Sequence, residues 1–162
     1  MKNSQLGGIE MNRAIAVFAL DEGRYALDLS VVERVHRIVE ITPLPKAPDV
    51  VMGVINVHGD VIPVMNVRRR FGLPEREIRL SDQLIVAKLS SRRIAVLVDR
   101  VIDILPVSEL PAIDGHDMLP GIDYVEGVVK LSGGMAFIHD LEKFLSVQEA
   151  EALDQSMRQK QE

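Results

Sequence analysis

Short apolar segments separated by turn residues run along most of this chain, a pattern typical of β-hairpins rather than of long helices. In the clearest of them, 53–67, mostly β-branched apolar residues flank His58-Gly59-Asp60. Further pairs of apolar segments flank turn residues at 21–23, 90–92 and 132–134. The pattern therefore predicts four hairpins, at 12–28, 53–67, 83–98 and 124–139.

Between the hairpins, prolines and polar runs predict loops. Pro43, Pro45 and Pro48 stop any helix or central strand, and the charged run 75–82 and the Pro/Gly-containing run 110–121 read as surface loops. Ser30 and Glu33 have the spacing of a capping box, which predicts one helical turn capped by Ser30.

The C-terminal segment has a different pattern. A second capping box, Ser146 to Glu149, opens a run without Gly or Pro, and Ala150, Leu153 and Met157 fall on one helical face. We expect a helix over 146–162 that packs on the β-core, with a weak i,i+4 pair between Asp154 and Arg158.

The chain repeats itself at an offset of 74 residues. The run GVINVHGD that begins at Gly53 matches GVVKLSGG from Gly127 in its glycines, its apolar positions and its turn. The repeat predicts two β-units of about five short strands each, the pattern of small barrels. We place them at 25–80 and 81–145, with the strand 12–20 crossing between them and 1–11 as a flexible tail.

Composition narrows the classes of partner. The 162 residues carry a net charge of −5, which disfavours nucleic acid, and they include no cysteine for a disulfide or a thiolate. Arg68–Arg70 makes a local basic patch, which we interpret as a solvated turn, with an acidic protein partner or nucleic acid as alternatives. With no membrane-spanning run and no secretory apolar segment, we expect a cytoplasmic protein without direct membrane insertion.

Candidate chemistry is sparse. The four histidines have no recognised metal-ligand spacing, and the chain has neither a phosphate-binding Gly-rich loop nor a GxSxG motif. The pair His58 and Asp60 is the strongest candidate for a chemical site. We consider three interpretations of this pair: turn or interface residues, a binding contact, or a metal ligand or general base. We predict no catalytic residue, metal or cofactor, and we keep a small metal- or ligand-binding enzyme using His58 and Asp60 as the alternative to a protein-binding surface.

The residues quoted above lead to a family resemblance. The run GVINVHGDVIPVMNVR from Gly53 resembles the motif G-V-x-N-L-R-G-x-x-x-P-V-x-D-L-R of the CheW family of chemotaxis adaptors. Tyr25-Ala-Leu-Asp-Leu, the prolines from Pro43 to Pro48 and Ala95-Val-Leu-Val-Asp-Arg-Val fit as well, so the resemblance covers about 14–153.

The resemblance implies an all-β fold of two intertwined five-stranded SH3-like barrels followed by a C-terminal α-helix. It implies a non-catalytic scaffold that couples the cytoplasmic tips of methyl-accepting chemoreceptors to the regulatory domain of a CheA-type histidine kinase, in chemotaxis or related signal transduction. Such an adaptor lies at membrane-associated receptor arrays through its partners.

Carried over residue by residue, the resemblance implies three sets of site residues. The kinase-binding surface would contain Arg34, Ile41, Thr42 and Gly53. A receptor-binding groove between the barrels would contain Val32, His58 and Leu84. The motif turn would contain Asn56 and Gly59.

Two positions depart from the family motif. His58 replaces an arginine and Asn66 replaces an aspartate. Histidine lacks the planar five-donor fork of arginine, so a bidentate contact to a receptor carboxylate could not be reproduced here.

Overall fold

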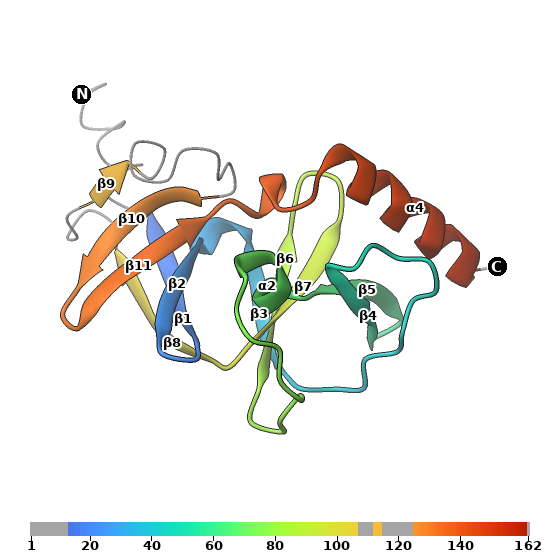
Figure 1. Cartoon of the computed structure of the whole chain (residues 1–162), viewed down its shortest axis with the longest axis horizontal. Coiled ribbons are helices and arrows are strands. Elements are labelled where there is room, and N and C mark those ends of the chain that lie inside the picture. Colours follow the sequence, from blue (N-terminus) through green and yellow to red (C-terminus); the bar gives the residue numbers. More distant parts are fainter. Residues whose placement is uncertain (1–12, 107–111, 115–124, 162) are drawn as a thin grey trace. The chain divides into compact units, whose positions relative to one another are not determined.

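The computed structural model describes residues 13–106, 112–114 and 125–161 (Figure 1). Its strands are β1 (Ala14–Leu20), β2 (Gly23–Asp28), β3 (Val32–Arg37), β4 (Val51–Val57), β5 (Asp60–Met65), β6 (Gln83–Lys88), β7 (Arg93–Val98), β8 (Arg100–Pro106), β9 (Ala112–Asp114), β10 (Val125–Leu131) and β11 (Gly134–His139). Its helices are the 3-10 turns η1 (Leu29–Val31) and η3 (Leu141–Lys143), and the α-helices α2 (Val67–Phe71) and α4 (Val147–Gln161).

The strands form two mixed sheets, and each sheet belongs to its own compact unit. Unit 1 holds a sheet of order β8-β1-β2-β11-β10-β9, and unit 2 holds one of order β3-β6-β7-β5-β4. This confirms the predicted fold class, an all-β chain of two related units with a C-terminal helix. The first sheet has one strand more than the five expected.

The two sheets repeat one topology, as the 74-residue offset predicts. Gly53 pairs with Val64 in unit 2, and Gly127 pairs with Ile138 in unit 1, each just after a register shift in its strand. A parallel contact, β5 with β7 or β11 with β2, joins two hairpins in each sheet. The sequence repeat is therefore a repeat of strand pairing.

The division into units differs from the boundaries expected at 25–80 and 81–145. Of the described residues, those up to Val32 and those between Asp99 and Lys143 belong to unit 1, and those between Glu33 and Val98 and from Phe144 onward belong to unit 2. The hairpin β6–β7 lies with β3 to β5 because β7 pairs in parallel with β5, while β8 runs on to pair with β1. Both units are thus built from two separate stretches of chain. The expected tail, 1–11, lies outside the described residues.

Each unit has its own apolar core. In unit 1 the cluster consists of Ile15, Val17, Ala26, Val129, Ala136 and Ile138. In unit 2 it consists of Ile55, Ile62, Val64, Leu84, Val86 and Ala95. Most of these side chains are β-branched, a residue type that packs well on a pleated surface.

Helix α4 begins as the sequence predicts. The N–H of Glu149 donates to Oγ of Ser146 (3.1 Å), and the N–H of Ser146 donates to the Glu149 carboxylate (2.9 Å), a complete capping box. Arg70 of α2 holds the first turn through both carboxylate oxygens of Glu149, each at 2.6 Å. No helix within the described part of the chain is long and apolar enough to span a membrane.

Two local expectations need correction. The helical turn near residue 30 is capped by Asp28, whose carboxylate accepts the N–H of Ser30, rather than by Ser30 itself. Within the segment expected to be a loop, residues 112–114 form the short strand β9 against β10; the rest of that segment lies outside the described residues.

Candidate functional site

The motif turn between β4 and β5 is a tight reversal held by one side chain. Oδ1 of Asn56 accepts the N–H of Gly59 at 2.9 Å. His58 and Gly59 both have positive φ, 52° and 91°, as the two central residues of a type I′ turn require. Glycine adopts this conformation without strain, and the turn displays the exposed His58 side chain at its tip.

Three of the four residues expected to face a kinase lie together at one end of unit 2. Thr42 and Val54 exchange two backbone hydrogen bonds of 2.8 Å, which brings the chain after Ile41 against Gly53. A Cβ atom on Gly53 would lie 2.3 Å from the Thr42 carbonyl oxygen. Glycine is therefore required by this close approach of two backbones.

Arg34 occupies a separate place in the same unit. It is exposed on β3, at the opposite end of the strand order from β4, where Gly53 lies. The strand order alone does not bring Arg34 beside Ile41, Thr42 and Gly53.

The residues expected in a receptor groove differ in accessibility. Val32 is half-buried at the start of β3, and His58 is exposed. Leu84 is fully buried in the core of unit 2, where it packs with Ile55 and Val86. Its side chain supports the sheet and is not accessible to a partner, so only Val32 and His58 stay candidates for the groove.

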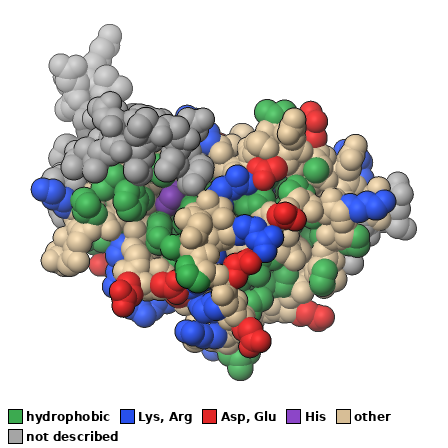
Figure 2. Space-filling model, in the orientation of Figure 1, with side chains coloured by type: hydrophobic (Ala, Val, Ile, Leu, Met, Phe, Trp, Pro, Cys, Tyr) green, Lys and Arg blue, Asp and Glu red, His purple; other side chains and the backbone are tan. Residues whose placement is uncertain are grey.

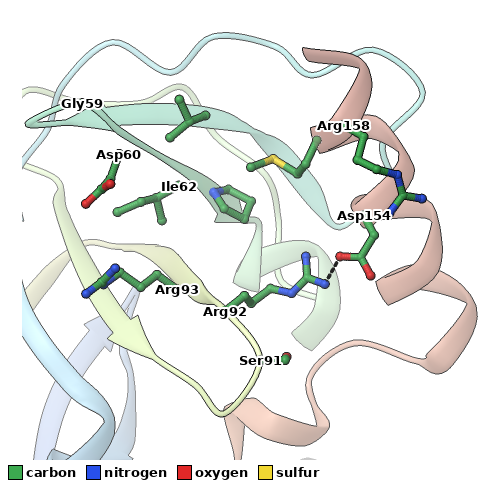
Figure 3. Close-up of a pocket in the computed structure, with 11 residues that line it drawn as sticks. Gly59, Asp60, Ile62, Ser91, Arg92, Arg93, Asp154 and Arg158 are labelled. Atoms are coloured by element: carbon green, nitrogen blue, oxygen red, sulfur yellow. Dashed lines mark hydrogen bonds and ion pairs between the residues drawn. The ribbon is translucent and has the colours of Figure 1, made fainter. Parts of the chain in front are cut away.

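A cavity of ≈590 Å³ lies beside the motif turn, within unit 2 (Figure 3). Its lining comes from the turn and β5, from the β6–β7 turn and from the last turns of α4: Gly59, Asp60, Val61, Ile62, Pro63, Ser91, Arg92, Arg93, Asp154, Met157 and Arg158. In Figure 3 the Arg92 guanidinium meets the Asp154 carboxylate across the cavity, while Asp60 and Arg158 lie at opposite sides.

Ion pairs fix two of the arginines in this cavity wall. Arg92 donates to the Asp154 carboxylate, and Nε of Arg93 lies 2.7 Å from Glu33 Oε2 on β3. The hydrogen bond from Arg93 lowers the pKa of the exposed Glu33 carboxyl. The cavity lining mixes the apolar side chains of Val61, Ile62, Pro63 and Met157 with charged side chains.

The sequence did not predict the ion pairs that line this cavity. The Asp154–Arg158 spacing suggested a pair within α4, but Asp154 instead binds Arg92, which lies far away in the sequence. The helical spacing could place Asp154 on a face of α4, but nothing local indicates which strand turn that face meets.

The basic patch at Arg68–Arg70 lies on the short helix α2 rather than in a turn, and of its three arginines Arg69 is exposed. Arg69 binds Glu75 through both carboxylate oxygens, and Arg70 binds Glu149 and lies with Cζ 5.4 Å from the centroid of the Phe144 ring. Arg68 is buried and donates to the carbonyl oxygen of Pro74 (3.0 Å). These arginines are engaged within the unit, so the nucleic-acid alternative loses its basis.

Metal chemistry also gains no support. The described residues contain no group of three or more His, Asp or Glu side chains that could hold a metal ion, at His58 and Asp60 or elsewhere. His139 is 5% exposed and packs against the Tyr25 ring, with centroids 5.5 Å apart.

The sequence and the structure of this chain were compared with those of known proteins. The family model described as "CheW-like domain" matches residues 14–149. Similar relatives include the chemotaxis protein CheW of Rhizobium meliloti, 30% identical with 86% of this chain and 92% of the relative covered. The chemotaxis protein CheW of Thermotoga maritima is 32% identical, with 79% and 84% covered.

A solved structure agrees with the sequence comparisons. The scaffolding protein TtCheW from Thermoanaerobacter tengcongensis superposes with a TM-score of 0.71 at 28% identity, covering 86% of this chain and 91% of that one. With the family model matching most of the chain, and with the same fold in a solved relative, this chain belongs to the CheW-like domain family.

Proposed function

We propose that this chain is a non-catalytic adaptor that couples chemoreceptors to a CheA-type histidine kinase, in chemotaxis or a related signalling pathway. The observation that carries the proposal is the match to the CheW-like domain family over residues 14–149. Its relatives are named as chemotaxis proteins, and a solved relative is described as a scaffolding protein. The adaptor acts in the cytoplasm, at membrane-associated receptor arrays that it joins through its partners.

The kinase regulatory domain binds the end of unit 2 that carries Ile41, Thr42 and Gly53, with Arg34 as a further contact. The paired backbones at Thr42 and Gly53 support this assignment because they give the surface a fixed shape. A preformed surface loses less conformational entropy on binding than a mobile one.

The receptor contacts the motif turn of unit 2, with Val32 as a further contact residue. The exposed His58 supports this assignment, since the turn around it is held by Asn56 and Gly59 and displays the side chain to solvent. Histidine at this position makes the receptor contact of this adaptor different from one built on a bidentate arginine.

The kinase contact is tested by calorimetric titration of the chain with the regulatory domain of the CheA-type kinase from the same genome. We expect a complex, and we expect Arg34→Glu to weaken it about tenfold, or about 1.4 kcal/mol. Arg37→Glu is the matched control, because Arg37 is also exposed on β3 but its side chain points to the other face. No complex at tens of micromolar, or equal losses in both variants, would contradict the assignment.

The receptor contact is tested by His58→Arg, which introduces the residue of the family motif. We expect altered affinity for the receptor signalling domain and an unchanged urea unfolding midpoint, because the side chain is exposed. A lowered midpoint with unchanged receptor affinity would make position 58 a structural residue of the turn.

A further inference from the structure

Two cavities, one in each unit, lie at equivalent places in the repeat. The cavity of unit 2 lies between the β4–β5 turn and the β6–β7 turn. In the strand order of the other sheet, these hairpins correspond to β10–β11 and β1–β2. A cavity of ≈690 Å³ in unit 1 lies between the turns of those two hairpins, and we call it the socket.

The strand register relates the two cavities residue by residue. The parallel contacts pair Val64 with Ala95 in unit 2 and its counterpart Ile138 with Ala26 in unit 1. Arg93 and Arg24 each lie two residues before these alanines, so they are equivalent, and each lines the cavity of its unit. The two cavities are therefore two copies of one site, built by the same pair of hairpins.

Helix α4 supplies one wall of this site in unit 2. Asp154 and Met157, from the last turns of the helix, line the cavity, and Leu153 beside them is fully buried. Asp154 ties the helix to the β6–β7 turn through Arg92 (Figure 3). Unit 2 thus covers the site with a helix that offers apolar side chains and an acidic one.

Among the described residues, no α-helix covers the same site in unit 1, because α2 and α4 both belong to unit 2. Met135 is 44% exposed and Ile102 is 40% exposed, and Leu131 is only partly buried. In Figure 2 hydrophobic side chains lie at the surface over the β10–β11 hairpin. The apolar side chains that line the socket include Val17, Tyr25, Ile102, Leu131, Met135 and Phe137.

We propose that the socket of unit 1 binds an amphipathic α-helix of a partner protein, at the place that α4 covers in unit 2. An amphipathic helix buries its apolar face in a hydrophobic groove through residues spaced three and four apart, the spacing of Leu153 and Met157 in α4. The repeat supports this occupant, since the same hairpins already hold a helix in the other unit.

The charged residues of the socket specify the polar side of the helix. Arg24 is half-buried in the lining and suits an acidic residue, as Arg92 suits Asp154 in unit 2. Glu22 and Asp103 are exposed and suit basic residues at the edge of the contact. Complementary charges of this kind select one orientation of the helix.

The occupant is a helix of another protein rather than α4 of a second copy. Helix α4 is held in its own unit by the buried Leu153 and by the ion pairs of Glu149 with Arg70 and of Asp154 with Arg92. The proposal goes beyond the adaptor function, because the socket lies in unit 1 whereas the motif turn and the surface at Thr42 and Gly53 lie in unit 2.

A labelled peptide with the sequence of residues 146–161 is the probe, because it contains α4 with its capping box. Fluorescence anisotropy during titration with the full chain should show saturable binding, and Met135→Glu should weaken it about tenfold. Ile104→Glu is the matched control, since Ile104 is 55% exposed on β8 but does not line the socket. The urea unfolding midpoint of each variant checks its fold.

Exchanging charges provides a second test that leaves the apolar residues intact. Arg24→Glu should weaken binding of the peptide, and a peptide with Asp154→Lys should bind the Arg24→Glu chain more tightly than it binds the unaltered chain. Binding of the peptide in place of α4 in unit 2 would be indifferent to Met135→Glu and Arg24→Glu. That result, the absence of saturable binding, or equal losses in Met135→Glu and Ile104→Glu would each overturn the proposal.

Discussion

Gly53 shows how one missing side chain shapes a surface. A Cβ atom there would meet the Thr42 carbonyl oxygen at 2.3 Å and its carbon at 2.9 Å, both backbone atoms that no rotamer change can move. We expect Gly53→Ala to break the Thr42–Val54 bridge and to lower the free energy of unfolding by about 2 kcal/mol or more, measured by urea titration. Gly133→Ala is the control, since its Cβ would meet nothing within 4 Å; equal effects of the two substitutions would contradict the steric explanation.

His139 makes stability depend on pH. Burial lowers its pKa from 6.5 to about 3, so the unfolded chain takes up a proton at this residue well before the folded one does. The contribution of neutral His139 is fully present above pH 6.5 and is lost as the pH falls from 6.5 towards 3. We expect about 2 kcal/mol less stability at pH 5 than at pH 7 from this residue.

The repeat supplies the control for that experiment. Met65 occupies the position equivalent to 139 in unit 2 and is fully buried. In a His139→Met variant, urea unfolding at pH 7 and pH 5 should lack this component of the pH dependence. An unchanged dependence would assign it to other groups.

At the scale of single residues, the sequence predicted the role of a position correctly where local backbone geometry favours one residue type. The repeated glycines and the position of His58 in a turn were predictable, because turn geometry is local. The burial of Leu84 was not predictable, since the sequence does not distinguish an apolar strand residue in a core from one at an interface. The arginines at 68–70 were misjudged because Glu149 is distant in the sequence and ties Arg70 only in the folded chain.

At the scale of elements, helix α2 explains one departure from the family motif. Oδ1 of Asn66 caps the helix by accepting the N–H of Arg69 (3.1 Å), and Nδ2 of Asn66 donates to Glu75 (2.7 Å). An aspartate would keep the cap but would face the Glu75 carboxylate without a proton to donate. The Asn66 amide and the Glu75 carboxylate are therefore matched as hydrogen-bond donor and acceptor.

This arrangement predicts a specific rescue. Asn66→Asp should lower the urea unfolding midpoint at low salt, by an amount that shrinks at high salt, because two like charges then share the helix start. Adding Glu75→Gln should restore the midpoint, since the glutamine amide can donate to the new carboxylate. A double variant no more stable than Asn66→Asp would contradict this explanation.

The hairpins and α4 were predictable because their signals are local: period-two apolar residues, turn residues and a capping box. The short strand β9 was missed because three residues after a proline carry little periodicity. The assignment of hairpins to units was missed because it depends on the parallel contacts β5–β7 and β2–β11, for which no local pattern exists.

At the scale of the whole molecule, strands from both halves of the chain build each sheet. Unit 2 needs β3 to β5 together with β6 and β7, and unit 1 needs β1 and β2 together with β8 to β11. We expect a chain cut between Ile78 and Arg79 to yield two fragments that lack cooperative unfolding alone and regain it when mixed, followed by circular dichroism. A cut at Gly133 is the control, because the longer fragment keeps every strand of unit 2; a stably folded fragment from the first cut would contradict the prediction.

Because the sheet of unit 1 combines strands from distant parts of the chain, it can form only late in synthesis. Arg24 of β2 pairs with Ala136 of β11, so the sheet of unit 1 stays incomplete until β11 has left the ribosome. Contacts this distant in sequence slow folding, because the chain must close a long loop before any pairing stabilises it. During that delay the apolar hairpin β1–β2 has unpaired edges, the kind of exposed strand edge that promotes aggregation of incompletely folded chains.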